Sequence, residues 1–211
     1  GTGAFSFAFW IKVDDWTSNY IMSKREDDNN RWYFVTTGSD EIRFGCDVGG
    51  STLMSATCTT VLTPYENQWL HLAFTSNRSG TNRWFINGKF IDTDTDSNSD
   101  DWDNSGSLYV NRLDTNYGSP ASPGSNRISE IVRYNTALSI GKIATIYNEG
   151  YMYDHLNGVS SAYLKAWWRM GDGTERGSGT TIYDMSSYTN NGTLTTASAT
   201  AIIGDTPNDD Q

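Results

Sequence analysis

Hydrophobic and polar residues alternate along much of this chain, and a period of two predicts β-strands. The clearest case is residues 4–13, AFSFAFWIKV, where every second residue is apolar. Side chains that alternate along a strand point to opposite faces of the sheet. We therefore expect one face of this strand to be buried between two packed sheets, a face made of Phe5, Phe7, Phe9, Ile11 and Val13.

Three consecutive antiparallel strands are predicted in the middle of the chain, at residues 69–76, 83–86 and 89–92. The last two are joined by Asn87-Gly88. Asn-Gly suits the two φ > 0 positions of a type I′ turn and is a strong hairpin signal. Because three strands in succession form the middle of a meander, the sequence predicts an all-β protein.

Short strands separated by turn residues continue on both sides of this meander. They are predicted at 20–23, 32–36, 41–46, 54–62, 107–111, 127–134, 163–170, 180–184 and 193–195. One helix is predicted, at 139–149, with Ser139 as N-cap and Gly150 at the C′ position. Its buried face would carry Ile140, Ile143, Ala144 and Tyr147. Many short strands with one short helix predict a β-sandwich.

Composition and charge exclude several classes of partner. A chain of 211 residues fits a single sandwich domain. Its formal net charge of −10 disfavours nucleic acid and anionic membrane surfaces. No apolar stretch approaches the roughly 20 residues that span a bilayer, so we expect no membrane insertion. The first residue is Gly1 rather than Met, which indicates a processed chain or a fragment.

The two cysteines, Cys46 and Cys58, flank a Gly-Gly turn. A hairpin centred near Thr52 would place them opposite each other and allow a disulfide. A hairpin centred on Gly49-Gly50 would hold them farther apart than the roughly 7 Å between Cα atoms that a disulfide tolerates. The sequence leaves both a disulfide and two free buried thiols open.

Four stretches carry a family resemblance. They are FSFAFWIKVDDW (5–16), NQWLHLAFT (67–75), RWFINGKFID (83–92) and RISEIVRYNTALSIGKIATIYNEG (127–150). In this order and near this spacing they resemble the laminin-G-like, concanavalin A-type jelly-roll family. The resemblance implies a concanavalin A-like sandwich of two antiparallel sheets with one short helix near 139–149.

The C-terminal stretch 164–194 resembles the segment that normally opens such domains. It either completes the same sandwich in circularly permuted order or begins a second, truncated copy. Only about 17 residues follow Leu194, too few for another sandwich. We therefore expect residues 1–211 to form a single domain, with 1–150 as the main sandwich and 151–211 completing it. The arrangement is similar to that of laminin-G-like proteins of marine phages, which implies a virion surface protein.

The sequence argues against an enzyme. Glucanases that share this jelly roll need strand-spaced carboxylates in an E-x-D-x-x-E pattern, and no such run occurs. Serine nucleophile motifs are also absent. Of the two histidines, His71 lies in a predicted strand, where we expect a half-buried structural residue. His155 lies in a predicted loop, where we expect no residue to engage it.

Calcium is the one cofactor that the sequence suggests. Ca²⁺ takes six to eight oxygen ligands from carboxylates and carbonyls in flexible loops. The candidate ligands lie in the most acidic stretch of the chain: Asp92, Asp94, Asp96 and Asp100. Ser97 stands where an EF-hand loop needs glycine, so a solvated acidic hairpin end is the alternative interpretation. Asp92, Asp94 and Asp96 would share one face if the strand continues.

Glycan binding would use exposed aromatic rings beside amide and carboxylate groups. Trp102 is the first candidate because its loop is otherwise polar, with Asp101 and Asn104 beside it. A tryptophan folded back onto the sheet is the alternative. Asn116 and Tyr117, in a Gly/Pro/Ser-rich loop, are the next candidates.

From these observations we expect a non-catalytic recognition or adhesion module that binds a glycan or a host surface. It would belong to a virion or an extracellular assembly and would contact other subunits of that assembly. The alternative is a purely structural virion decoration or fibre component that binds no sugar.

Overall fold

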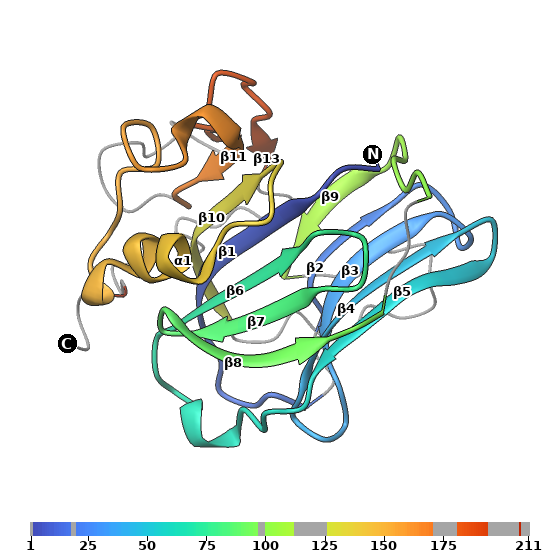
Figure 1. Cartoon of the computed structure of the whole chain (residues 1–211), viewed down its shortest axis with the longest axis horizontal. Coiled ribbons are helices and arrows are strands. Elements are labelled where there is room, and N and C mark those ends of the chain that lie inside the picture. Colours follow the sequence, from blue (N-terminus) through green and yellow to red (C-terminus); the bar gives the residue numbers. More distant parts are fainter. Residues whose placement is uncertain are drawn as a thin grey trace.

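The computed structural model describes residues 2–17, 20–96, 100–111, 126–170 and 181–193, together with Pro207. Two antiparallel sheets pack face to face, which confirms the concanavalin A-like sandwich (Figure 1). The six-stranded sheet contains, in order, β11 (Leu164–Trp168), β10 (Arg127–Tyr134), β1 (Phe5–Lys12), β6 (Leu70–Ser76), β7 (Asn82–Ile86) and β8 (Lys89–Asp94). The five-stranded sheet contains β5 (Ser51–Cys58), β4 (Ile42–Val48), β3 (Arg31–Thr36), β2 (Tyr20–Arg25) and β9 (Ser107–Val110).

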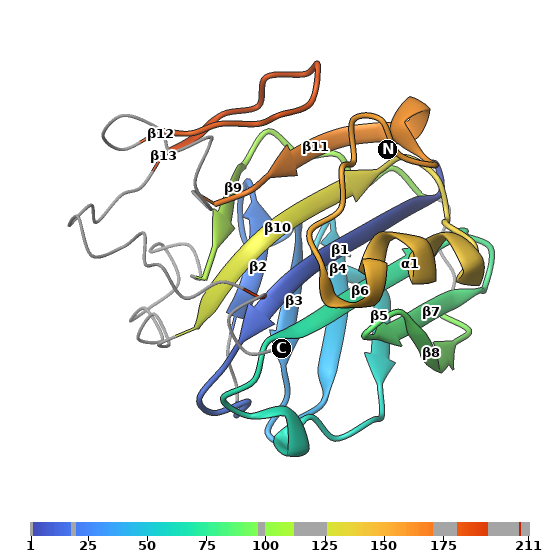
Figure 2. The ribbon, with the colours of Figure 1, turned by 90° about the vertical axis from the view of Figure 1, so that its left-hand side faces the viewer.

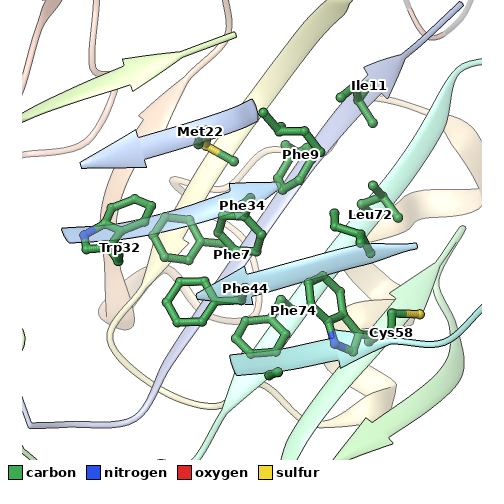
Figure 3. Packing of buried hydrophobic residues seen from close by; sticks show 14 of the residues in the cluster. Phe7, Phe9, Ile11, Met22, Trp32, Phe34, Phe44, Cys58, Leu72 and Phe74 are labelled. Carbon is green, nitrogen blue, oxygen red and sulfur yellow. The ribbon is translucent and has the colours of Figure 1, made fainter. Parts of the chain in front are cut away.

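The main core lies between the two sheets and is built from aromatic rings. The predicted inner face of β1 is buried there, and Phe7 packs edge-on against Phe34 of β3 with ring centroids 5.4 Å apart. Phe44 and Phe74 stack across the interface at 5.1 Å. Figure 3 shows these rings interdigitating. Close packing of this kind makes the core the main source of stability.

A second hydrophobic cluster covers the outer face of the six-stranded sheet. Helix α1 (Ile140–Tyr147) lies across this sheet (Figure 2) and buries Ile143 and Ile146. The expected buried face was wrong in part, because Ile140 and Ala144 are exposed. The helix is only two turns long, and its last residue, Tyr147, is half-buried against the rings of Trp10 and His71. Ser139 is the N-cap, as predicted: its side chain accepts from the Lys142 amide.

The Asn87-Gly88 turn joins β7 to β8 as predicted, with φ of 47° at Asn87 and 72° at Gly88. Asn87 also fixes β6, because its Oδ1 accepts from the His71 amide at 3.0 Å and its own amide donates to the His71 carbonyl at 2.9 Å. A Cβ on Gly88 would lie 2.9 Å from the Tyr147 side chain. Glycine is therefore required by both the turn and the helix above it.

The C-terminal segment adds an edge to the six-stranded sheet. Beyond two short 3₁₀ turns, η2 (Asn148–Gly150) and η3 (Ser161–Tyr163), strand β11 pairs with β10. Asp184 then holds the turn between the short strands β12 (Thr181–Ile182) and β13 (Gly192–Thr193), since its carboxylate accepts from the amides of Trp167, Ser186 and Asn190, each at 2.9 Å. Burial alone would raise the pKa of Asp184, but these amides outweigh it and the pKa lies below its ordinary value.

The hairpin of β4 and β5 is centred on Gly49-Gly50, where Val48 pairs with Ser51. In this register Cys46 lies opposite Met54 and Cys58 opposite Ile42, so the cysteines do not meet. Both are free thiols buried in the core. Of the two alternatives that the sequence allowed, the structure has the second. Burial raises the pKa of Cys46 to about 12, which makes this thiol a poor nucleophile.

The described helices give no indication of a membrane-spanning segment. In the described ranges none is both long and apolar enough to cross a bilayer.

Candidate functional site

Trp102 is buried, and the expectation that it is exposed was wrong. Only 6% of its surface is accessible. Its ring lies 4.9 Å from that of Phe5 and 5.4 Å from that of Phe44, with the Arg78 guanidinium 5.1 Å above it. The residue therefore folds back between the two sheets, the alternative that the sequence allowed, because an indole gains more from this aromatic core than from water.

The polar neighbours of Trp102 hold its loop against the five-stranded sheet. Oδ1 of Asn104 accepts from Nζ of Lys24 at 3.0 Å and from the Gly106 amide at 3.1 Å. Asp101 is exposed, and its Oδ1 accepts from the Asp103 amide at 2.9 Å. These groups satisfy the backbone of the loop. Asn116 and Tyr117 lie outside the described residues.

The three aspartates of β8 and its continuation form an aspartate ladder, Asp92, Asp94 and Asp96. They share one face, as the sequence predicted, and this face points at the edge of β5 in the other sheet. Every second backbone amide along β5 and just beyond its end donates to one of these carboxylates: Ser55 to Asp96 at 2.5 Å, Thr57 to Asp94 at 3.2 Å and Thr59 to Asp92 at 2.7 Å.

The aspartate ladder thus closes one side of the sandwich. Strand β5 is an edge strand whose amides would otherwise lack partners, and such edges invite pairing with other chains. Burial would raise the pKa of Asp92, but hydrogen bonds from Thr59 outweigh it and hold the pKa below its ordinary value. No group of three or more His, Cys, Asp or Glu within the described ranges is arranged to hold a metal ion. Calcium at Asp92, Asp94, Asp96 and Asp100 stays a prediction.

Removing one carboxylate of the ladder should cost stability. We expect Asp94→Ala to lower the free energy of unfolding by about 1–2 kcal/mol, because the Thr57 amide loses its acceptor. Asp94→Asn keeps an acceptor oxygen and should cost much less. Urea unfolding of both variants, in calcium and in EGTA, measures this. A stability gain from calcium that disappears in Asp94→Asn would show instead that the carboxylate is a metal ligand.

The outer face of the five-stranded sheet carries a different group of residues. We call it the tyrosine face and define it by Tyr20, Tyr33, Arg31 and Arg43. Tyr33 alternates with the buried Trp32 and Phe34 along β3, so its ring points outward. It lies over Gly45, its pairing partner on β4, where an added Cβ would come within 2.3 Å of the ring. The ring therefore lies directly above Gly45 on the outer face of the sheet.

Two arginines flank this ring. The guanidinium carbons of Arg31 and Arg43 lie 5.5 and 5.9 Å from its centroid. Nε of Arg31 is paired with Asp47 at 2.7 Å, and the Thr52 hydroxyl donates to the same carboxylate at 2.9 Å. Burial, and secondarily the Asp47 charge, raise the pKa of Tyr33, so the phenol keeps its proton and remains a hydrogen-bond donor.

The tyrosine face differs from the outer face of the other sheet in what lies over it. Helix α1 packs on the six-stranded sheet, on the side away from β2 to β5 (Figure 1). None of the described helices packs on the tyrosine face, and Tyr20, Tyr33 and Arg43 all remain partly exposed. This site was not predicted from the sequence. The alternation of Trp32, Tyr33 and Phe34 could have placed Tyr33 outward, but Gly45 beneath it is recognisable only once the strand register is known.

Neither histidine is available for chemistry at a surface. His71 is 3% exposed, fully rather than half buried, and lies between the rings of Trp10 and Tyr147. His155 does have partners, contrary to the expectation from the sequence: its Nδ1 lies 2.6 Å from the Tyr134 hydroxyl. Burial lowers the pKa of each histidine to about 3, so both are neutral at physiological pH.

A family model matches well over half of the chain. It is described as the concanavalin A-like lectin/glucanases superfamily and matches residues 1–144. Among curated proteins, botulinum neurotoxin type C from Clostridium botulinum C phage is 27% identical over 106 residues. This alignment covers 43% of the chain and 7% of the toxin, so the chain corresponds to a small part of that relative.

Solved structures show the same fold at low sequence identity. A proposed carbohydrate-binding protein from Bacteroides ovatus superposes with a TM-score of 0.61 at 19% identity, covering 91% of this chain and 52% of that one. A SAP-like pentraxin from Limulus polyphemus gives 0.51 at 16%, covering 68% and 69%. A structure of botulinum neurotoxin type C, whose cell entry depends on interaction with two ganglioside molecules, gives 0.51 at 20%, covering 69% and 35%.

Proposed function

Because the chain belongs to the concanavalin A-like lectin/glucanases superfamily, we propose that it is a non-catalytic recognition module that binds a glycan through its tyrosine face. A shared fold alone does not assign a function, so the function must be argued from the site. The observation that carries it is the ring of Tyr33, which lies over Gly45 on a face that α1 leaves open.

A flat aromatic ring on a sheet suits a sugar. The C–H groups on one side of a pyranose form an apolar surface that stacks on an aromatic face, while its hydroxyls need donors and acceptors around the ring. The tyrosine face offers both. The phenol of Tyr33 is a donor and an acceptor, and the guanidinium of Arg43 is a donor only. The ring is held in place by Gly45 below and Tyr20 at its edge, 6.0 Å between centroids, so little ordering is required on binding.

The comparisons support this class of ligand. The Bacteroides ovatus protein is described as a proposed carbohydrate-binding protein, and cell entry of the type C neurotoxin depends on interaction with gangliosides, which carry sugars. Both proteins are much longer than this chain, so their activities come to it only as part of the proposal. We also propose that residues 1–211 act as a single domain on an extracellular or virion surface, within a larger assembly. Tail, capsid or fibre genes beside the coding sequence would support the virion setting.

Tyr33→Ala should weaken glycan binding by roughly tenfold or more, since the stacking surface is lost. The measurement is a glycan array followed by calorimetry on the best ligand, each in calcium and in EGTA. Tyr151→Ala is the matched control, because Tyr151 is exposed and follows α1 on the other side of the sandwich. We expect this control to bind like the wild type.

Gly45→Ala tests the same ring without removing it. The added methyl group collides with Tyr33 and lifts the ring from the sheet, so binding should fall although every ligand-contacting group remains. Equal binding by the wild type, Tyr33→Ala and Gly45→Ala would place the ligand elsewhere. An array without signal in either calcium or EGTA would refute glycan recognition. Release of reducing sugar from a bound glycan would refute the non-catalytic assignment.

A further inference from the structure

Arg43 differs from the other arginines near the tyrosine face because its charge is not balanced by a described residue. Arg31 is paired with Asp47, and Arg25 is paired with Asp28. The guanidinium of Arg43 makes no hydrogen bond or ion pair with any residue that the structure describes. Its Nε is fully buried without an acceptor. Because this Nε is closed off from solvent, a ligand on the face would reach the outer guanidinium nitrogens, where the unbalanced positive charge favours a negatively charged group.

Arg43 lies close enough to Tyr33 to contact a sugar stacked on that ring. On β3 and β4, Arg31 pairs with Asp47, Tyr33 with Gly45 and Val35 with Arg43. Arg43 therefore stands one row beyond the ring, on the side opposite the neutralised Arg31. A pyranose on Tyr33 would direct the substituents at one end toward this guanidinium. The fork of an arginine matches a carboxylate or a sulfate with two parallel hydrogen bonds.

We propose that the tyrosine face selects a glycan that carries an acidic group, a carboxylate or a sulfate, which pairs with Arg43 while the sugar ring stacks on Tyr33. This inference rests on the proposed function and defines its substrate class. The net charge of −10 adds a limit, because a long polyanion would be repelled by the rest of the protein. A sugar with a single acid group meets Arg43 at short range and suffers little from that repulsion.

The test compares sugars that differ only in the acid group. Lactose, 3′-sialyllactose and 3′-sulfolactose are titrated into the wild type and into Arg43→Gln, with heparin as the polyanion. The first arm distinguishes neutral from acidic sugars, and the two acidic sugars distinguish carboxylate from sulfate. Arg83→Gln on β7 of the other sheet is the matched control, since it removes the same charge at a distance. Melting temperatures establish that each variant is folded.

For the wild type and Arg83→Gln, we expect at least one acidic sugar to bind roughly tenfold tighter than lactose, and heparin to bind no tighter than that sugar. Arg43→Gln should reduce the preference to about twofold or less, while lactose loses much less affinity because the glutamine amide still donates a hydrogen bond. Arg43→Lys should fall between the two, because it keeps the charge and loses the fork.

The failures are distinguishable. If the wild type binds lactose but shows no acidic preference, or if Arg43→Gln keeps the preference, the acidic-ligand inference is overturned and glycan binding stands. If heparin binds tightest, selection of a single acid group is overturned. If none of these sugars binds and the glycan array is also without signal, glycan recognition fails, and the acidic-ligand inference fails with it.

Discussion

Acidification from pH 6.5 to about pH 4.5 is expected to remove about 5 kcal/mol of folding free energy, because two buried histidines take up protons only when the chain unfolds. Both His71 and His155 have pKa values lowered from 6.5 to about 3 by burial. Above pH 6.5 they are neutral in either state and contribute no pH dependence. Between pH 6.5 and 3 the unfolded chain binds two more protons than the native one, so stability falls as the pH falls.

The surroundings of the two histidines explain why they stay neutral. His71 is enclosed by Trp10 and Tyr147, and within the described residues its Nδ1 has no hydrogen-bond partner. His155 packs between Tyr153 and Trp167 and is hydrogen-bonded to Tyr134. Burial also raises the pKa of Tyr134, so its hydroxyl keeps the proton that it can donate to the histidine. No carboxylate of the described residues makes a hydrogen bond to either ring, so a charged imidazole would be poorly solvated.

The measurement is urea unfolding at several pH values between 7 and about 4.5. Two protons correspond to a slope of about 2.7 kcal/mol per pH unit. His155→Gln keeps an acceptor for Tyr134 and should halve that slope, whatever it does to stability at pH 7. Asp184 and Asp92 have lowered pKa values and add their own losses only in more acidic solution, near and below pH 4, so they do not confuse the comparison. Stability that is constant from pH 6.5 to 4.5 would contradict the prediction.

Trp102→Ala is expected to lower the free energy of unfolding by about 3–5 kcal/mol, the usual cost of emptying a buried tryptophan site. The indole fills the space between Phe5, Trp32 and Phe44, with ring centroids 4.9 to 6.0 Å away. It also carries the buried Arg78 on its face. Loss of the indole therefore leaves a cavity and an arginine without its stacking partner.

Denaturant unfolding of Trp102→Ala and Trp102→Phe checks this, with the phenylalanine variant losing less because it refills part of the space. Glycan affinity of the folded variants should match that of the wild type. The opposite outcome, an unchanged melting temperature with lost glycan binding, would return Trp102 to the role of an exposed sugar platform that its polar sequence neighbours first suggested.

Local patterns in the sequence predicted the fold well because they report directly on strands and turns. The inner face of β1 and the Asn87-Gly88 turn follow from alternation and turn chemistry alone. The shared face of the aspartate ladder also followed from alternation. The partners of the aspartate ladder could not be predicted in this way, because the β5 amides come 33 to 41 residues earlier in the chain. Hydrogen bonds between the two sheets leave no local signal.

The candidate site was less predictable for two physical reasons. Trp102 was assigned to the surface because its neighbours are polar, yet those polar groups satisfy the backbone of their own loop and let the indole turn inward. The tyrosine face depends on which residue of β4 lies under Tyr33, and a register between strands is a property of the assembled sheet. Arg43 became a candidate only after Asp47, on the same strand, was seen to pair with Arg31.

The central place of β1 has a consequence for how the chain is made. β1 is an early strand, but its neighbours come late: Phe5 pairs with Ser76 of β6, and Ser6 with Tyr134 of β10. A ribosome therefore releases the phenylalanine-rich strand long before either partner exists. Until β10 has been synthesised, the backbone groups along one edge of β1 are unpaired and can pair with other chains. The sandwich can therefore fold only after most of the domain has been made. We therefore expect this strand to need protection by a chaperone during synthesis.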